Sequence, residues 1–449
     1  MMNMQRIRIR RHLALLAVLA GLGLLAAACG EDEAGEAGQD TLDEATEDDP
    51  VEITMYYPIA VGGPLEDVVD GLVADFEAEH PEIQVNPVYS GNYDDTIVQA
   101  QSAIDAGDVP ATTVLLSTDM FSLIDDDLIV PFDELVTDED EEEWLDSFYD
   151  EFMLNSRDGE GTTWGIPFQR STIVQYYNKD AFEEAGLDPE QPPGTWDELV
   201  DMSAQVQEGS DVEWGVQMPS SGFPYWLFQT FTTQMGVEIV NDEGNEVYYD
   251  QPEVVEALEF WHSLNDEHGV HPPGVVDWGT TPEDFLQEET AIIWTTTGNL
   301  ASIRDDAPFD FGVAPMPENV EPGSPTGGGN FYIFEGAPEE EQRAAFQLIR
   351  FLTQPEQAAE WSIETGYVAP SPEAWETDQM QEYVEDFPEA EVARDQLGDT
   401  VRELSTYQRG EVYDIVNDGL QAAVTGEQSP EEALADIDER ANEVLEPYR

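Results

Sequence analysis

Strand-like and helix-like segments alternate along the chain from residue 51 onward. The segments Val51–Tyr57, Ile83–Tyr89 and Thr112–Ser117 are rich in β-branched, aromatic and other apolar residues, which is typical of buried strands. Between them, apolar residues recur at helical spacing over Leu65–Phe76, and a second helix is predicted over Asp94–Ala106. A strand–helix–strand–helix–strand order predicts a mostly parallel sheet flanked by helices, which is the α/β class.

A second series of strands and helices follows, so the chain is expected to form two lobes. Strands are predicted over Ile173–Tyr177, Trp214–Met218 and Ala291–Thr295, and a helix over Pro252–Glu267. The region from 339 to 449 is predicted to be largely helical. From residue 51 onward the chain has about 400 residues, which exceeds the size at which a single hydrophobic core usually stops growing.

A capping signal marks one further helix of this series. Thr195 and Glu198 stand three residues apart before an apolar periodic segment, which predicts a capping box at the start of a helix over Trp196–Gln207. Another helix is expected around Trp226.

The N-terminus resembles a bacterial lipoprotein signal. Four arginines precede the apolar segment Leu13–Leu25, which is followed by Ala26–Ala28 and by Cys29, the single cysteine of the chain. We therefore predict a signal peptide over 1–28 and a lipidated acidic tether over 29–50. The alternative is a membrane-spanning helix, but the apolar run is shorter than the roughly 20 residues that a span needs. Arg10-Arg11 leaves both the general and the twin-arginine export routes open.

The charge of the chain indicates a saline setting. Fifteen Lys and Arg stand against 99 Asp and Glu, for a net charge of −84. Such self-repulsion destabilises a fold at low ionic strength and is screened in molar salt, where the screening length is roughly 3 Å. No basic stripe is present, so nucleic acid is excluded as a partner.

The scarcity of cations and thiols excludes several enzyme classes. The single lysine, Lys179, follows Asn178 rather than the glycine of a phosphate-binding loop. Lipidation of Cys29 leaves no free thiol for catalysis or metal binding. We expect His268 and His271 to decorate a loop rather than bind a metal, and we expect no cofactor.

Several segments, taken in their order and spacing, resemble a known family. They are GGPLEDVVDGL (62–72), SGNYDD (90–95), IPFQRSTIVQYYNKDAFEEAGLDPEQPPGTWDEL (166–199), TTTGNLASIR (295–304), GSPTGGGNFYIF (323–334) and PEQAAEWSIETGYVA (355–369). The family is that of the extracellular solute-binding proteins of ABC importers, in the sugar-binding group that includes a glycerol-3-phosphate binder.

The resemblance implies a two-lobed α/β fold of the periplasmic-binding-protein type II, with discontinuous lobes joined by a multi-strand hinge. The first lobe would combine 51–166 with 298–353, and the second 168–295 with 355–449. The lobes would close over a solute in the cleft between them.

The resemblance also implies where the ligand binds. The family's contact positions fall on Tyr93, Ser117, Ser171, Thr296, Gly328, Tyr367 and Tyr413. All except Gly328 carry hydroxyl groups, which suit a sugar or a polyol. The glycerol-3-phosphate binder has a glutamate at the position of Ser117 and an arginine at that of Tyr413, so the phosphate contacts differ here.

Other side chains extend this predicted site. Arg170 is the candidate replacement for a phosphate-binding arginine, and the alternative is a structural ion pair. The amides of Gly327–Gly329 are further candidates for an oxyanion, or the three residues form a tight loop. Four aromatic residues are candidates for stacking on a sugar ring or for core packing: Trp196, Tyr225, Trp226 and Trp294.

The predicted function is solute capture without catalysis. A membrane-anchored lipoprotein would bind a sugar or a polyol phosphate, with sn-glycerol-3-phosphate as one named candidate, and deliver it to the ABC permease subunits as a monomer. The alternatives are a secreted glycoside hydrolase, which needs two carboxylates about 5 to 9.5 Å apart, and a structural surface lipoprotein that binds nothing.

Overall fold

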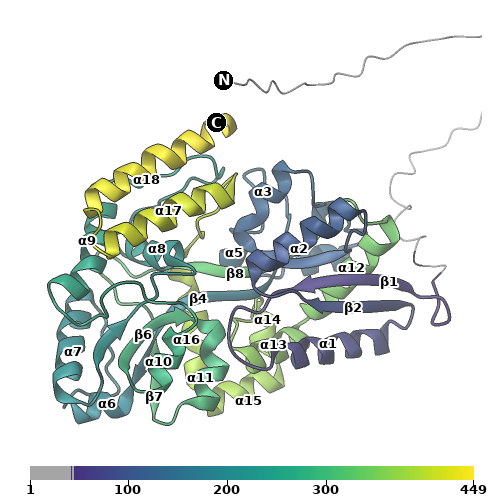
Figure 1. Ribbon diagram of the computed structural model, residues 1–449. Helices are drawn as coiled ribbons and strands as arrows, with labels where there is room; N and C mark the ends of the chain where they lie inside the picture. The colour runs from purple at the N-terminus through teal and green to yellow at the C-terminus, as the bar shows by residue number, and fades with distance from the viewer. Residues whose placement is uncertain (1–41, 43–44) are drawn as a thin grey trace, which may run out of the picture. The chain divides into compact units, whose positions relative to one another are not determined.

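The computed structural model describes residue 42 and residues 45–449 (Figure 1). Cys29 and the predicted signal peptide lie outside the described residues, as does most of the acidic tether. Across the part that is described, every helix is too short or too polar to cross a membrane.

The N-terminal strands pair in parallel, as predicted, and form one end of the sheet. Strand β1 (Val51–Tyr57) pairs in parallel with both β2 (Ile83–Tyr89) and β3 (Thr112–Leu116). The connections are helix α1 (Leu65–Glu79) and helix α2 (Tyr93–Ala106). The predicted α/β alternation is therefore confirmed, and the strand boundaries agree with the predicted ones to within one residue.

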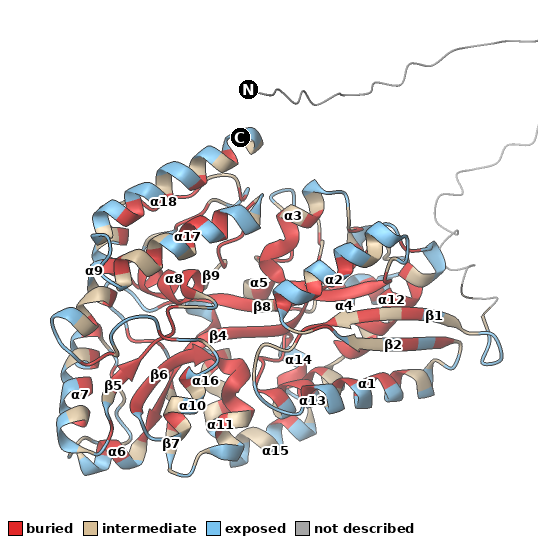
Figure 2. Ribbon diagram, in the orientation of Figure 1, coloured by how far each residue is buried: buried red, intermediate tan, exposed pale blue. Residues whose placement is uncertain are grey.

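Helices cover both faces of this sheet because side chains alternate along each strand. Val114 and Leu116 of β3 face a core that contains Phe76 of α1 and helix α12 (Glu339–Leu352). Leu115, between them, faces a second core on the opposite side, next to helix α3 (Met120–Asp125). Figure 2 shows the resulting pattern, with buried strands between helices that are exposed on their outer sides.

Strand β4 (Ile166–Asn178) joins this sheet to the rest of the molecule. Its first half pairs with β8 (Ser324–Ile333), which also pairs with β3, whereas residues 173–177 pair with β6 (Thr290–Thr296). In Figure 1 β4 and β8 run side by side across the centre. Only Ile173–Tyr177 was predicted as a strand, because polar side chains at 169–172 interrupt the apolar pattern although they are buried.

The second part of the sheet is also covered on both faces. Strand β5 (Trp214–Gln217) pairs in parallel with β6, and β7 (Phe311–Ala314) pairs antiparallel with β4. On one face lie helices α7 (Trp196–Gly209), α8 (Pro224–Gln234), α9 (Pro252–Asp266), α17 (Arg409–Val424) and α18 (Pro430–Leu445). On the other lie α11 (Leu300–Asp306), α13 (Pro355–Thr365), α15 (Asp378–Asp386) and α16 (Glu391–Asp395).

Two features of this region differ from the sequence-based expectations. Thr195 accepts the Glu198 N–H at 3.2 Å, but the Glu198 carboxylate accepts from the Gly194 N–H, so only half of the capping box forms. His268 is exposed, but His271 is buried, with its Nε2 3.0 Å from the Met218 amide. Burial lowers the pKa of His271, so this histidine is part of the packing and does not decorate a loop.

The boundaries of the two lobes stay a prediction. Strand β7, which the resemblance assigns to the first lobe, pairs with the half of β4 that also pairs with β6. The strand that follows β7, β8, pairs with the first half of β4.

Candidate functional site

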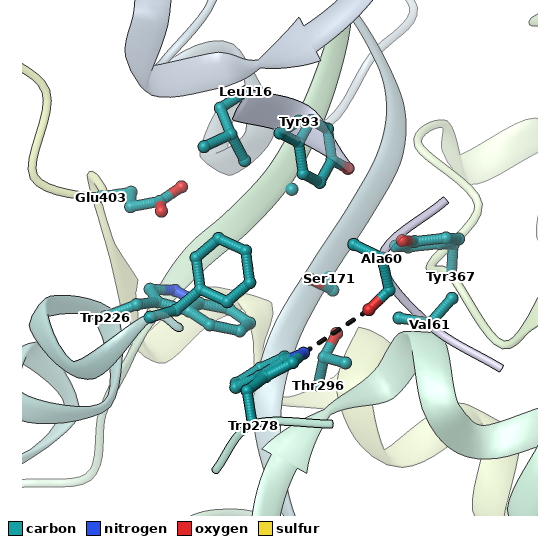
Figure 3. A pocket seen from close by; sticks show the side chains of 12 residues that line it. Ala60, Val61, Tyr93, Leu116, Ser171, Trp226, Trp278, Thr296, Tyr367 and Glu403 are labelled. Atoms are coloured by element: carbon teal, nitrogen blue, oxygen red, sulfur yellow. Dashed lines mark hydrogen bonds between the residues drawn. The ribbon is translucent and has the colours of Figure 1, made fainter. Parts of the chain in front are cut away.

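A small cavity lies beside β4 and β8, at the ends of β3 and β6. Its walls come from segments far apart in the chain (Figure 3). The lining residues are Ala60, Val61, Tyr93, Leu116, Ser171, Phe223, Trp226, Trp278, Thr296, Gly328, Tyr367 and Glu403.

Six of the predicted binding residues meet at this cavity. They are Tyr93, Ser171, Trp226, Thr296, Gly328 and Tyr367. Four of these side chains come from four different elements: Tyr93 from α2, Ser171 from β4, Trp226 from α8 and Thr296 from β6. The side chains of Tyr93, Ser171, Thr296 and Tyr367 therefore share one space, although they span most of the sequence.

Local backbone structure explains how two of these residues reach the cavity. Tyr93 is the first residue of α2, which Asn92 and Asp95 begin with a full capping box. Thr296 is the last residue of β6, and its hydroxyl accepts the Gly298 N–H at 3.1 Å. Both residues thus lie where an element begins or ends.

The glycines 327–329 lie within strand β8, so the tight loop considered from the sequence is wrong. Gly328 has a φ of +96°, and a Cβ there would collide with the Gln169 carbonyl oxygen. A Cβ at Gly327 would collide with the Trp226 ring. The glycines therefore let that ring lie directly on the strand, where its Nε1 donates to the Thr326 carbonyl at 2.9 Å.

Two tyrosine hydroxyls supply neutral polar groups to the cavity. Tyr93 donates to Gln169 Oε1 at 2.6 Å, and Gln169 in turn donates to the Pro58 carbonyl at 3.1 Å. Burial raises the pKa of Tyr93, with a further contribution from Tyr367, and burial also raises the pKa of Tyr367. Both phenols therefore stay protonated at neutral pH.

An aromatic wall faces these hydroxyls. Trp226 and Trp278 have ring centroids 6.0 Å apart, and the Phe223 ring meets Trp278 edge-on at 5.0 Å. Figure 3 shows the Trp278 Nε1 pointing to the Ala60 carbonyl, at 3.5 Å. Sequence analysis missed Trp278 and Phe223, because both lie outside regular helices and strands, where no periodicity indicates their direction.

Glu403 is a charged residue of the lining that was not predicted from the sequence. The residue is 2% exposed, and its Oε1 accepts from the Tyr225 hydroxyl at 2.9 Å and its Oε2 from Ser117 Oγ at 3.4 Å. Burial raises the pKa of Glu403 to about 7, although the positive charges of Arg170 and Arg409 oppose this shift. With 99 acidic residues in the chain, no sequence signal distinguished this one.

Charged groups are scarce around the cavity. Within the described residues, Glu403 is the one acidic side chain that lines it, and the lining contains no lysine, arginine or histidine. The walls therefore offer hydroxyl groups, aromatic faces and a single carboxylate.

Three predicted residues lie outside the lining. Ser117 is fully buried behind Glu403, and the Tyr413 hydroxyl donates to the Leu404 carbonyl. Arg170 projects from β4 toward the Phe152 ring, 5.2 Å from its centroid, and donates through Nη1 to Asn330 Oδ1 at 3.3 Å.

Arg170 forms no salt bridge in the part of the chain that the structure describes, and its Nε and Nη2 atoms find no hydrogen-bond partner there. Burial lowers the pKa of Arg170 to about 10. The structural ion pair, which was the alternative for Arg170, is therefore wrong, and the guanidinium does not line the cavity either.

Three of the four candidate stacking residues pack in the core instead. Trp196 stacks on Phe260 at 4.1 Å between ring centroids, and Trp294 is fully buried near Phe231. The Tyr225 ring packs against Tyr413 at an angle of 42°, and its hydroxyl donates a hydrogen bond to Glu403.

Comparisons with known proteins agree with this architecture. The model of the family described as bacterial extracellular solute-binding protein matches residues 71–389. The sn-glycerol-3-phosphate-binding periplasmic protein UgpB of Shigella flexneri serotype 5b is 29% identical over 416 residues, covering 88% of this chain and 93% of the relative. UgpB of Salmonella typhimurium is 28% identical with the same coverage.

Solved structures share the fold. UgpB from Mycobacterium tuberculosis, in complex with glycerophosphocholine, superposes with a TM-score of 0.77 at 24% identity, over 89% of this chain and 99% of that one. The cyclic α-maltosyl-1,6-maltose binding protein from Arthrobacter globiformis gives 0.75 at 24% identity, over 89% and 100%. The expected two-lobed type II fold is thereby confirmed, and the chain belongs to the bacterial extracellular solute-binding protein family.

Proposed function

We propose that this protein is the receptor of an ABC importer and that its cavity binds a small neutral sugar or polyol. The observation that carries this proposal is the lining, which combines the hydroxyls of Tyr93, Ser171, Thr296 and Tyr367 with the aromatic wall. Hydroxyls can pair with ligand hydroxyls, and aromatic faces can cover the C–H surface of a sugar ring.

A phosphorylated ligand is the second candidate, because the name of UgpB states that it binds sn-glycerol-3-phosphate. Recognition of phosphate usually relies on Arg or Lys, whereas here the described lining has no cation and includes the Glu403 carboxylate. Arg170 lacks a carboxylate partner, which would suit a phosphate, but its side chain lies outside the lining. We therefore favour the neutral ligand.

Closure is proposed to occur about β4, with the lobe boundaries expected from the resemblance. This strand pairs with β8 in its first half and with β6 in its second, and Ser171 lies close to the change of partner. A ligand would favour the closed state only by its differential affinity for it.

The rest of the proposal concerns the location of the protein, its oligomeric state and the absence of catalysis. We propose that lipidated Cys29 anchors a monomer outside the membrane in a saline medium. We also propose that the protein has no catalytic activity, since a glycoside hydrolase needs two carboxylates and the described lining supplies one.

A titration tests the ligand class. Calorimetry in molar KCl with glucose, maltose, glycerol, glucose-6-phosphate and sn-glycerol-3-phosphate should show saturable binding of a neutral compound. Ser171→Ala should weaken that binding by about two- to tenfold, because it removes one hydrogen bond. Ser203→Ala, which removes another buried hydroxyl that does not line the cavity, should not. Binding of the phosphate esters alone, or hydrolysis of a chromogenic glycoside, would overturn the proposal.

A further inference from the structure

Glu403 occupies a cavity position that neither the sequence nor the family resemblance assigned. It lies in the segment between strand β9 (Thr400–Val401) and α17, and its carboxylate points into the cavity from the side opposite Tyr367 (Figure 3). We propose that Glu403 selects the ligand: its carboxylate accepts hydrogen bonds from ligand hydroxyls and disfavours phosphate esters. This inference rests on the proposed function.

The backbone of Glu403 is held in place independently of its side chain. Its N–H donates to Asn155 Oδ1 at 2.9 Å, and its carbonyl accepts from Asn155 Nδ2 at 3.1 Å. Asn155 is itself fully buried, and its own carbonyl accepts from Asn330 Nδ2 at 3.1 Å. A carboxylate mounted on such a support is preorganised, so a ligand need not order it.

The carboxylate keeps acceptor capacity for a ligand. Its two oxygens offer about four lone-pair sites. One hydrogen bond from Tyr225 and one long hydrogen bond from Ser117 use two of them. The unused sites belong to a group that lines the cavity, where a sugar hydroxyl can donate to them.

No contact neutralises the charge of this carboxylate. The groups that face it are Arg170, Arg409, Tyr93, Tyr225 and Tyr413. Arg409 instead pairs with Asp119 at 3.2 Å, and across the described chain neither arginine comes within 4.0 Å of Glu403 oxygens. When Glu403 is ionised, an anionic ligand would therefore meet a like charge in the cavity, which is unfavourable.

The protonation of Glu403 supplies a second, independent readout. Burial raises the pKa of Glu403 to about 7, so the carboxylate loses its proton between about pH 6 and pH 8. A ligand that donates to the carboxylate favours the charged form. Its affinity should therefore rise with pH across this window.

The experiment compares three proteins by calorimetry in molar KCl: wild type, Glu403→Gln and the control Glu411→Gln. Glu411 is exposed at the start of α17 and lies outside the cavity. With glucose, maltose and glycerol as neutral probes, Glu403→Gln should weaken binding by about tenfold or more, because a charged acceptor is lost. The wild type should bind the neutral probes more tightly than sn-glycerol-3-phosphate, and this difference in affinity should be smaller in Glu403→Gln. The affinities of Glu411→Gln should match those of the wild type.

The outcomes separate the two proposals. Neutral binding by the wild type with unchanged affinity in Glu403→Gln overturns the role of Glu403 and leaves the proposed function standing. A wild type that binds no neutral probe overturns both. If Glu403→Gln does not fold, the pH profile of the wild type decides: an affinity for the neutral probe that rises from pH 6 to pH 8 supports the inference, and a flat profile refutes it.

Discussion

Two glutamates, Glu141 and Glu403, are equally buried at 2% exposure but have opposite surroundings. Glu141, in helix α4 (Glu139–Leu145), pairs with the guanidinium of Arg343 on α12 and also accepts from the N–H and the hydroxyl of Thr137. Glu403 has no ion pair among the described residues and receives only hydroxyl donors through its side chain.

The difference distinguishes a structural charge from one that is available to a ligand. The Glu141 carboxylate accepts hydrogen bonds from other groups of the protein and connects α4 to α12, so it is not available to a ligand. Glu403 retains part of its hydrogen-bonding capacity and lines the cavity. Burial alone therefore does not indicate function; the set of partners does.

The largest expected effect concerns the structural site. Glu141→Ala should lower the free energy of unfolding by about 3 to 5 kcal/mol, because it leaves Arg343 buried without its carboxylate. Denaturant unfolding in molar KCl measures this change. The control Glu142→Ala, on the exposed face of the same helix, should stay within about 0.5 kcal/mol of the wild type. Equal effects of the two variants would contradict the structural role of Glu141.

The second-largest effect is expected in the pH dependence of stability, which tests the surroundings of Glu403. The pKa of Glu403 is raised from 4.5 to about 7, so the folded state holds its proton to higher pH than the unfolded chain does. The free energy of unfolding should therefore fall as pH rises from 4.5 to 7, by about 3 kcal/mol from this group. Subtracting the profile of Glu403→Gln isolates this contribution. If the two proteins had parallel pH profiles of stability, the pKa of Glu403 would not be raised in the folded state.

A smaller effect is expected on the wall opposite the tyrosine hydroxyls. Trp278→Ala should weaken binding of a neutral sugar by about fivefold or more, since one aromatic face of the cavity is lost. Calorimetry gives the change, and Trp164→Ala, which truncates another half-buried tryptophan outside the cavity, is the matched control. A similar loss in both variants would point to a general structural effect.

The smallest effect should come from Ser117, which touches the ligand site only through Glu403. Its hydrogen bond to Glu403 is long, at 3.4 Å, so Ser117→Ala should weaken sugar binding by only about two- to fivefold. The loss should disappear when the substitution is made in Glu403→Gln, as a double-mutant cycle would measure. Additive losses would mean that Ser117 contacts the ligand directly.

Much of the fold followed from local patterns. The strand–helix alternation from Val51 to Ala106 appears at nearly the predicted boundaries, because alternating burial and helical periodicity are encoded within short windows. Strand β4 was predicted at less than half its length, since Gln169, Arg170 and Thr172 are polar residues buried by contacts with distant segments.

The sequence by itself determined the α/β class, the charge balance and, through family resemblance, six of the residues that line the cavity. Only the tertiary structure decided that Ser171 faces the cavity while its neighbour Arg170 faces Phe152, and that Glu403 and Trp278 complete the walls. The physical reason is the separation along the sequence of the residues that interact. Periodicity and capping depend on neighbours within a few residues, whereas a cavity forms where segments hundreds of residues apart pack together, and no local pattern records which of 99 acidic side chains will lie there.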